Sequence, residues 1–404
     1  MGSCFGLAAG DVLTGDRSLF FQNVVRCAVD LICIFLFVYI SKRGICMRNY
    51  IKAGMCSILT SLMLLAAGCL PAGLSADAAR RPQPTFNGNA WIAYWDFDRG
   101  LKEAVKIQSQ LNSVSYFAAA FDRNNKIILV GPAEKFTAQK FTRYKAEIKK
   151  YLTVVNDVYK DINNPAGESI EKDTQVLFRL FETDETMRGH SQDLLARVKK
   201  HRFDGLEIDY ENIWKNPQLA KKFVRFLEVL VPAAEEAKIP LRVILEPGIP
   251  VTAYKLPEGP EYVLMCYNLF GVHSVAAGPK ADDRFLDKML GKVKQLPRPH
   301  SIALATGGCV WQEGKRPCFI TEQEALALQK ELKVALHRDS LSAAQYFNGK
   351  DSAGKSVECW FADAKTIIAW KRQALDYGVD GISLWRLGGN HKIQEYYPGI
   401  MNKK

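Results

Sequence analysis

Short apolar runs alternate with longer stretches of mixed polarity from residue 90 onward. Runs of this length are typical of buried strands, and the stretches between them have apolar positions at helical spacing. The eight runs that we interpret as strands are Trp91–Trp95, Val114–Phe121, Tyr151–Asn156, Gly205–Tyr210, Leu241–Glu246, Tyr262–Tyr267, Ile302–Thr306 and Gly381–Trp385. Alternation of strands and helices indicates a parallel α/β fold, and eight repeats predict a closed (β/α)8 TIM barrel.

The stretches between these runs predict helices and two smaller features. The expected helices are Gly100–Leu111, Phe141–Lys150, Thr174–Phe181, Gln192–His201, Leu219–Ala237, Phe285–Gln295, Thr321–Ala335 and Ala364–Tyr377. Residues 126–130 predict a short hairpin on the loop after the second strand, and residues 345–363 predict a small β insertion between the seventh strand and the last helix. An open doubly wound sheet would also alternate, but no glycine-rich phosphate loop follows the first strand.

The first eighty residues differ from the rest of the chain. Two apolar runs, Leu31–Ile40 and Ile58–Ala67, are shorter than the roughly 20 residues of a membrane-spanning helix. The second run follows basic residues and precedes Ala76-Asp-Ala78, which predicts a signal peptide over residues 47–78. We interpret residues 1–46 as an upstream mis-start or a weak anchor, residues 79–89 as a linker and residues 90–398 as the barrel. A lipobox-like cleavage before Cys69 and a membrane helix remain alternatives, so the expected location is secreted or in the cell envelope.

Composition adds a basic charge and few cysteines to this outline. The chain carries 54 Lys and Arg against 43 Asp and Glu, a net charge of +11. The basic residues are dispersed and form no nucleic-acid-binding pattern, so we expect no nucleic acid partner and an association with anionic cell-wall polymers. Four cysteines, Cys266, Cys309, Cys318 and Cys359, follow the signal peptide without zinc-ligand spacing. Cys309 and Cys318 could form a short-loop disulfide or remain free thiols.

An acidic stretch is the strongest chemical signal in the sequence. Glu207, Asp209 and Glu211 alternate with apolar residues, which places three carboxylates on one face of the fourth strand. Like charges at this spacing raise the pKa of at least one of them, and carboxylates with separated pKa values suit general acid catalysis. An edge strand with a solvated acidic face would give the same alternation.

The other strand ends supply candidates for the same site, because barrel enzymes place their active sites at the C-terminal ends of the strands. Aromatic platforms beside carboxylates suit sugar rings, which have apolar faces and polar edges. The polar and aromatic candidates at these ends are Tyr94, Asp96, Asn156, Asp157, Glu246, Tyr267, Asn268, Trp385 and Arg386.

The segment Asp204-x-x-Glu207-x-Asp209-x-Glu211 resembles the DxxDxDxE signature of family 18 glycoside hydrolases, the chitinase-like TIM barrels. Met265-Cys-Tyr267-Asn268 resembles the M-x-Y-D segment of that family, and the segments around Trp360 and Trp385 also match. Glu207 and Asn268 depart from the family, which has Asp at both positions. The resemblance covers about residues 90–398 and favours the bacterial branch that acts on cell walls and spores.

The resemblance implies a role for each matched residue. Glu211 would protonate the glycosidic oxygen, and Asp209 would orient the 2-acetamido group of the substrate, which is the nucleophile in this family. Tyr267 would hydrogen-bond the acetamido carbonyl oxygen. Glu207 would lie deeper and tune Asp209, and Asp204 would brace the strand start. The residues expected to contact sugar are Tyr94, Asn268 and Trp385.

We therefore expect an exported, monomeric, retaining glycosidase that cleaves β-1,4-linked N-acetylglucosamine glycans. Peptidoglycan is favoured slightly over chitin, and neither a metal nor an organic cofactor is required. One alternative is a lectin-like relative that binds glycan without hydrolysis, although such relatives usually lack the terminal acid that Glu211 matches. Another alternative is a divalent-cation site formed by the acid cluster.

Overall fold

The computed structural model describes residues 87–160 and 169–396. The segments predicted at 1–46 and 47–78 lie outside these ranges, as does most of the predicted linker. Among the described residues, no helix combines the length and hydropathy needed to span a membrane.

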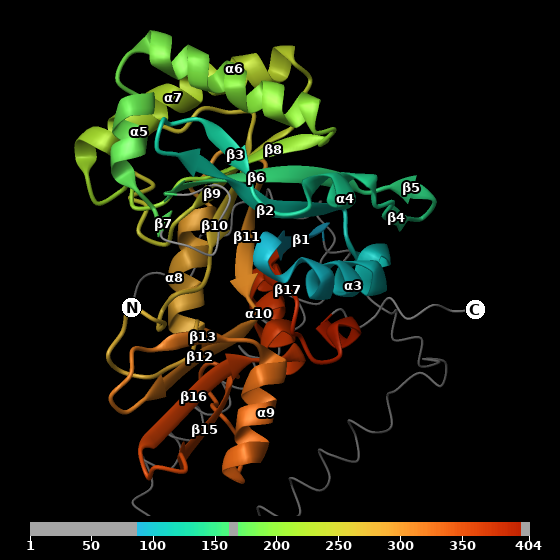
Figure 1. Ribbon diagram of the computed structural model, residues 1–404, viewed down its shortest axis with the longest axis vertical. Coiled ribbons are helices and arrows are strands. Elements are labelled where there is room, and N and C mark those ends of the chain that lie inside the picture. The colour runs from blue at the N-terminus through green and yellow to red at the C-terminus, as the bar shows by residue number, and fades with distance from the viewer. Residues whose placement is uncertain (1–86, 161–168, 397–404) are drawn as a thin grey trace, which may run out of the picture. The chain divides into compact units, whose positions relative to one another are not determined.

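Eight parallel strands form a closed barrel, which confirms the predicted fold class (Figure 1). Around the barrel the order is β1, β2, β6, β8, β9, β10, β11 and β17, and β17 pairs with β1 to close it. The strands are β1 (Asn87–Ala93), β2 (Ser113–Asp122), β6 (Lys149–Tyr159), β8 (Gly205–Asp209), β9 (Leu241–Leu245), β10 (Glu261–Met265), β11 (His300–Ala305) and β17 (Gly381–Leu387). Each predicted strand is present, and β1 begins earlier than we expected.

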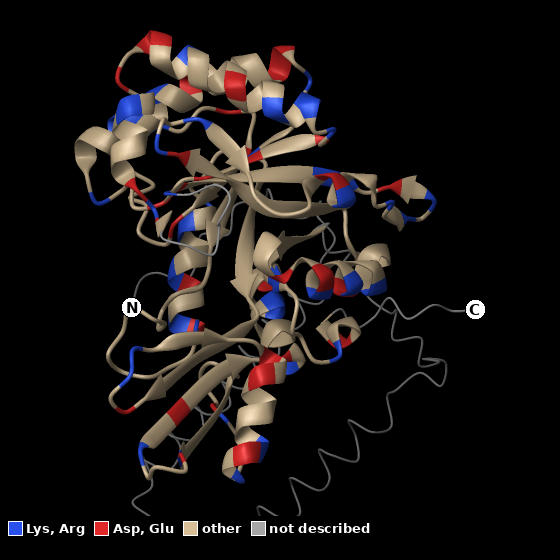
Figure 2. Cartoon of the chain, in the orientation of Figure 1, with Lys and Arg blue, Asp and Glu red and all other residues tan. Residues whose placement is uncertain are grey.

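The sequences of these strands are largely apolar runs because both faces of each strand are buried. Every residue of β8 and of β9 is buried. One apolar cluster lies between strands and helices, and a smaller cluster that includes Trp91, Met265 and Tyr267 fills the barrel. Figure 2 shows the strands largely free of charged residues and the helices carrying interspersed charges of both signs.

Helices cover the outside of the barrel. They are α3 (Phe97–Ile107), α4 (Ala133–Ala138), α5 (Thr174–Leu180), α6 (Asp184–Lys200), α7 (Pro217–Glu236), α8 (Asp283–Val293) and α10 (Ala364–Asp376). A further helix, α9 (Glu322–Leu332), packs against a separate sheet. Side-chain caps fix several of their starts, as where Asn216 accepts hydrogen bonds from the backbone of Gln218 and Leu219 at the start of α7. The segment from β9 to β10 contains no helix.

The helix predicted over Phe141–Lys150 is wrong. This segment forms a hairpin of β4 (Thr142–Arg143) and β5 (Ala146–Glu147), and then enters β6. Tyr144 and Lys145 turn the chain with φ angles of 49° and 69°, a left-handed conformation that no helix contains. A short helix, α4, lies earlier in the chain. The hairpin predicted near residue 128 is confirmed, since β3 (Ile127–Leu129) pairs antiparallel with β2.

The predicted β insertion is present and larger than the sequence indicated. It contains β12 (Gly307–Gln312), β13 (Cys318–Ile320), β14 (His337–Arg338), β15 (Gln345–Lys350) and β16 (Ser356–Ala362). These strands form an antiparallel sheet in the order β13, β12, β16, β15, β14, and α9 packs against it (Figure 1). The insertion therefore begins directly after β11 and includes the helix predicted over Thr321–Ala335.

The cysteine question left open by the sequence is answered by the sheet register. Cys309 lies opposite Phe319, and Cys318 lies opposite Val310, so the two thiols belong to opposite faces of the insertion sheet. All four cysteines of the described chain are free.

Candidate active site

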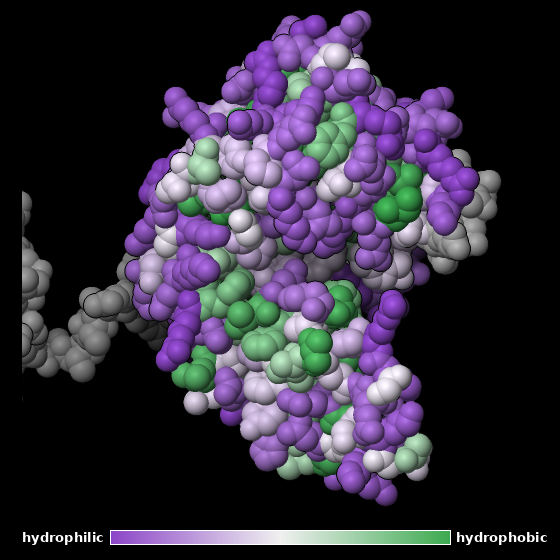
Figure 3. All heavy atoms as spheres, turned by 90° about the vertical axis from the view of Figure 1, so that its left-hand side faces the viewer, coloured by the Kyte–Doolittle hydropathy of each residue, from purple (hydrophilic) through white to green (hydrophobic). Residues whose placement is uncertain are grey.

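A cleft of about 650 Å³ opens where the barrel strands end. Six of the eight predicted site residues line this cleft, namely Tyr94, Asp209, Glu211, Tyr267, Asn268 and Trp385. Residues of the insertion, including Phe319 and Glu324, line it as well. Figure 3 shows a face of the molecule that is hollowed between an upper and a lower part, with hydrophobic residues gathered below the hollow. A hollow of about 880 Å³ beside β12 is lined by none of the predicted site residues.

The three alternating carboxylates lie at increasing distance from the barrel core. Glu207 is fully buried, Asp209 is 6% exposed, and Glu211 follows the end of β8 with 17% of its side chain exposed. The edge-strand alternative is excluded, because β8 lies between β6 and β9 in the closed barrel.

Glu207 is bound by polar partners inside the barrel and does not line the cleft. Its Oε2 accepts a hydrogen bond from Arg242 NH1 at 2.5 Å, and its Oε1 accepts one from Thr153 Oγ1 at 2.6 Å. Trp91 Nε1 and Ser115 Oγ donate as well. Burial raises the pKa of Glu207, and the neighbouring guanidinium and hydrogen bonds oppose that rise.

Asp209 has a buried oxygen without a hydrogen-bond partner among the described residues. Its Oδ1 is inaccessible to solvent and has no hydrogen-bond partner in the described parts of the chain. Buried polar atoms are nearly always paired, and an unpaired one costs about 1–3 kcal/mol. Burial, followed by the charges of Glu211 and Glu207, raises the pKa of Asp209 well above its ordinary value. A buried carboxyl that keeps its proton and lines a cleft is suited to hydrogen-bond a substrate group.

Glu211 is positioned by Asn156 and Lys172. Asn156 Oδ1 accepts a hydrogen bond from the backbone N–H of Glu211 at 2.8 Å, and Asn156 Nδ2 donates to the Glu211 carbonyl oxygen at 3.2 Å. Lys172 Nζ lies 2.5 Å from Glu211 Oε2. Lys172 follows β7 (Ser169–Ile170), and its backbone N–H donates to Asp157 Oδ1. Sequence reasoning missed Lys172, because it lies in a polar segment without periodicity.

Two further strand-end acids lie near this carboxyl. Burial raises the pKa of Asp157 to about 6, opposed by its hydrogen bond from Lys172. Burial also raises the pKa of Glu246, whose side chain accepts hydrogen bonds from the backbone of Asn212 and Ile213. Asp157 lines the cleft, whereas Glu246 holds the loop that follows Glu211.

Aromatic side chains form one wall of the cleft. Trp385 packs edge-on against Trp91 and Phe117, with ring centroids 6.0 and 4.8 Å apart. Trp95 is 52% exposed beside them and was not among the predicted site residues. The Tyr94 hydroxyl lies 2.7 Å from the Tyr159 hydroxyl.

Tyr267 and Asn268 lie at the end of β10 and line the cleft together. Tyr267 is buried, and burial together with the charge of Asp209 raises the pKa of its hydroxyl. Asn268 has a φ angle of 71°, a left-handed conformation that asparagine adopts more readily than most residues.

Asp204 lies outside the cleft. Its Oδ2 accepts a hydrogen bond from the backbone N–H of Lys150 at 2.8 Å, which ties the start of β8 to the start of β6.

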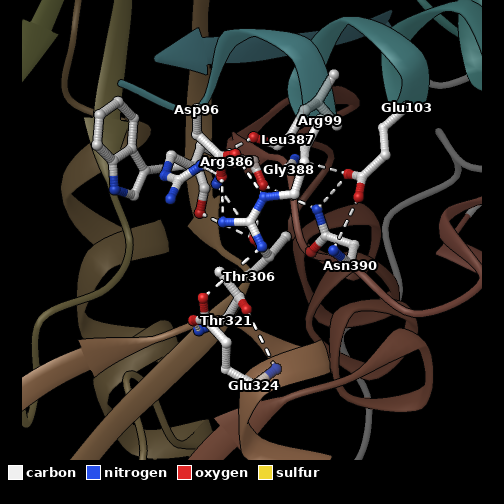
Figure 4. Close-up of polar contacts among 11 residues, drawn as sticks. Asp96, Arg99, Glu103, Thr306, Thr321, Glu324, Arg386, Leu387, Gly388 and Asn390 are labelled. Carbon is white, nitrogen blue, oxygen red and sulfur yellow. Dashed lines mark hydrogen bonds and ion pairs between the residues drawn. The ribbon is translucent and has the colours of Figure 1, made fainter. Parts of the chain in front are cut away.

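Arg386 and Asp96, both polar candidates from the sequence, form an ion pair of 2.5 Å at the cleft edge (Figure 4). Arg99 also binds Asp96 at 2.5 Å, and its NH1 lies 3.7 Å from Glu324 of α9. Thr306 Oγ1 donates to the Arg386 carbonyl oxygen at 2.8 Å. The network ties the chain around Trp385 to α3 and to the insertion.

The alternative of a divalent-cation site finds no support in this geometry. Among residues 87–160 and 169–396, no group of three or more His, Cys, Asp or Glu side chains is arranged to hold a metal ion.

Curated relatives are similar to this chain at low identity, and none of the known protein-family models matches it. The "uncharacterized glycosylase YvbX" of Bacillus subtilis is 20% identical over 298 residues, which is 70% of this chain and 83% of that protein. The "cortical fragment-lytic enzyme" of Bacillus anthracis is 30% identical over 79 residues, or 19% of this chain and 18% of that protein.

Solved structures share the fold over most of the barrel. The chitinase of Chromobacterium violaceum superimposes with a TM-score of 0.65 at 16% identity, covering 79% of this chain and 100% of that one. The spore cortex-lytic enzyme SleL of Bacillus cereus gives a TM-score of 0.64 at 16% identity, covering 77% of this chain and 74% of that one. The barrel fold that the resemblance implied is thus confirmed, and it is the fold of chitinases.

Proposed function

We propose that this protein is a glycosidase of the family 18 type that cleaves glycans containing β-1,4-linked N-acetylglucosamine. The observation that carries the proposal is the buried, unpartnered Oδ1 of Asp209 in a cleft beside Glu211 and an aromatic wall. The chitinase and cortex-lytic names of proteins with the same fold support this substrate class. The glycosylase name of the Bacillus subtilis relative supports the reaction type.

In the proposed mechanism, Glu211 donates a proton to the glycosidic oxygen as the bond to the leaving sugar breaks. The acetamido oxygen of the substrate attacks the anomeric carbon from within the same sugar, and water later opens the resulting ring with Glu211 as base, so the configuration is retained. Asp209 Oδ1 would bind the acetamido N–H, which places the acetamido oxygen for attack.

Three further residues have supporting roles in this proposal. Tyr267 would donate its hydroxyl proton to the acetamido oxygen, since its raised pKa keeps the hydroxyl protonated at neutral pH. Trp385 would form the apolar surface under the reacting sugar, and Tyr94 and Asn268 would contact its polar edges. Glu207 and Asp204 would act through the barrel, because neither lines the cleft.

The test compares wild type with Glu211→Gln on chitotetraose and on purified peptidoglycan glycan strands, with products identified by mass spectrometry. We expect the glutamine variant to lose about 10²- to 10⁴-fold in kcat, the usual contribution of a general acid. A wild-type protein that binds these glycans but turns them over no faster than the variant is instead a non-hydrolytic glycan-binding protein.

A glycan of this kind lies outside the cell, so the proposed activity fits the export predicted from residues 47–78. The proposed state is a monomer, as expected from the sequence. The net charge of +11 would favour association with an anionic cell wall.

A further inference from the structure

The charged residues that line the cleft are divided by sign. Carboxylates gather on the side of β6 to β8, where Asp157, Glu171, Asp209 and Glu211 lie with Lys172. The opposite side, formed by the ends of β10, β17 and β1 with the insertion, contributes the cations Arg99, Lys280 and Arg386 and the acid Glu324.

Two of the three cations on that side already have carboxylate partners. Arg386 and Arg99 share Asp96, and Arg99 also lies near Glu324. Lys280 is different: it is 6% exposed and forms no ion pair with any carboxylate of the described chain. Its partners are the Cys309 thiol and the Phe319 ring, whose centroid lies 4.3 Å from Lys280 Nζ. Burial lowers the pKa of Lys280, and neither partner supplies a full negative charge.

The backbone holds Lys280 beside the chain that follows β10. The Leu269 N–H donates to the Lys280 carbonyl oxygen at 2.9 Å, and the Phe270 N–H donates to the Pro279 carbonyl oxygen at 3.2 Å. These two bonds close the loop after β10. Lys280 therefore lies across from Leu269, the residue that follows Asn268. Gly278 permits this closure, since a Cβ there would lie 2.5 Å from the Phe270 ring.

Phe319 provides an apolar surface beside this amine. It is 63% exposed and lines the cleft, although large aromatic residues are usually more buried. A sugar beside Phe319 would bring its substituents within reach of Lys280, whose amine lies over this ring. The two residues together are suited to a sugar that carries an anionic group.

We propose that Lys280 and Phe319 form a subsite for a carboxylate-bearing sugar, so that the preferred substrate is an N-acetylmuramic acid-containing glycan rather than neutral chitin. This inference rests on the proposed function. The anion would be the lactyl carboxylate of the muramic acid or a carboxylate of its peptide stem. A buried amine gains a charge-assisted hydrogen bond from either one, which is stronger than a hydrogen bond between neutral groups.

The experiment measures kcat/KM of the full-length protein on matched tetrasaccharides of alternating N-acetylglucosamine and N-acetylmuramic acid. One carries free lactyl carboxylates, a second carries the same groups as methyl amides, and a third carries peptide stems. We expect wild type to prefer a carboxylate-bearing form over the amide by about tenfold. Preference for the free lactyl form identifies that carboxylate as the ligand, and preference confined to the third substrate identifies the stem. Equal rates on all three would overturn the proposal.

Variants test whether Lys280 is the residue responsible. The Lys280→Gln variant should no longer prefer the carboxylate-bearing substrate over the amide. The Lys280→Arg variant should keep this preference, because arginine retains the charge. Lys102→Gln, which removes an exposed lysine from the outside of α3, should retain the wild-type preference. A preference unchanged in Lys280→Gln would overturn the assignment. The comparison of acid with amide on wild type remains decisive if a variant does not fold.

Binding separates this inference from the proposed function. Calorimetry on Glu211→Gln with the acid and amide tetrasaccharides measures the preference without turnover. Tighter binding of the acid together with no hydrolysis by wild type would refute the glycosidase and retain the subsite. Hydrolysis of all substrates together with equal binding of acid and amide would refute the subsite and retain the glycosidase.

Discussion

Glu207 and Arg242 are register partners on β8 and β9 and form an ion pair inside the barrel. Arg242 also donates to Glu261 Oε2 at 3.1 Å and to Ser383 Oγ at 2.7 Å, so it links β8, β9, β10 and β17. The glutamate that departs from the family signature therefore contacts this arginine. Below the cleft, the barrel is held by polar contacts as well as by apolar packing.

Replacing Arg242 with methionine should destabilise the protein strongly. The change leaves the Glu207 carboxylate buried without its cation, a situation that typically costs about 3–5 kcal/mol. Urea denaturation followed by circular dichroism should show this loss in the free energy of unfolding. The double variant Glu207→Gln with Arg242→Met removes both charges, and we expect it to regain at least half of the loss. A double variant as unstable as the single one would contradict an electrostatic origin.

The barrel and its acidic strand could be predicted because burial on both faces leaves an unmistakable apolar pattern. Arg242 could also have been used to predict a buried ion pair, because a charge inside the apolar run Leu241–Leu245 requires a buried partner. The left-handed turn at Tyr144 and Lys145 was not predictable, since neither residue favours that conformation. Lys172, Trp95 and Lys280 lie in loops or at strand ends, and only the folded chain brings them to one cleft.

Replacing Asp209 with asparagine should increase stability at neutral pH. The unfolded chain ionises this carboxyl above about pH 3.8, whereas the folded chain retains the proton to a higher pH. The wild-type fold therefore loses stability as pH rises through this window, and asparagine, which does not ionise, loses none. The gain is about 1.4 kcal/mol for each pH unit by which folding raises the pKa.

Urea denaturation at pH 3 and pH 7 tests whether Asp209→Asn is more stable than wild type at the higher pH. The difference between Asp209→Asn and wild type should be present at pH 7 and absent at pH 3. Asp380→Asn, a change of the same kind at an exposed position, is the control variant. Although Asp209→Asn should gain stability, its kcat should fall, because the acetamido group loses its carboxyl partner. A variant that is less stable at pH 7 than wild type would refute the assigned direction of the pKa shift.

Replacing Trp95 with alanine should weaken substrate binding more than it affects folding. The indole is 52% exposed, so little buried area is lost, but it contributes to the aromatic wall with Phe117 and Trp385. Loss of one aromatic contact with a sugar corresponds to about a two- to tenfold rise in KM. Tyr144→Ala, which truncates a 73% exposed aromatic residue on the β4–β5 hairpin, should leave KM unchanged. Equal KM values for wild type and Trp95→Ala would remove Trp95 from the binding surface.

Replacing Asn156 with alanine should lower kcat while changing KM little. Asn156 does not line the cleft; its side chain binds the backbone N–H and carbonyl oxygen of Glu211 and also donates to the Asp173 carbonyl oxygen. Without it, the Glu211 N–H loses its partner, which costs about 1–3 kcal/mol of stability, and the carboxyl shifts from its place. Misplacement of a reacting group by about 1 Å can reduce a rate 100-fold, so we expect kcat to fall by about 10- to 100-fold. Steady-state kinetics below the melting temperature separates this effect from unfolding, and Asn156→Asp, which retains the acceptor, should recover part of kcat. If kcat falls no further than the folded fraction does, Asn156 serves the fold alone and does not position Glu211.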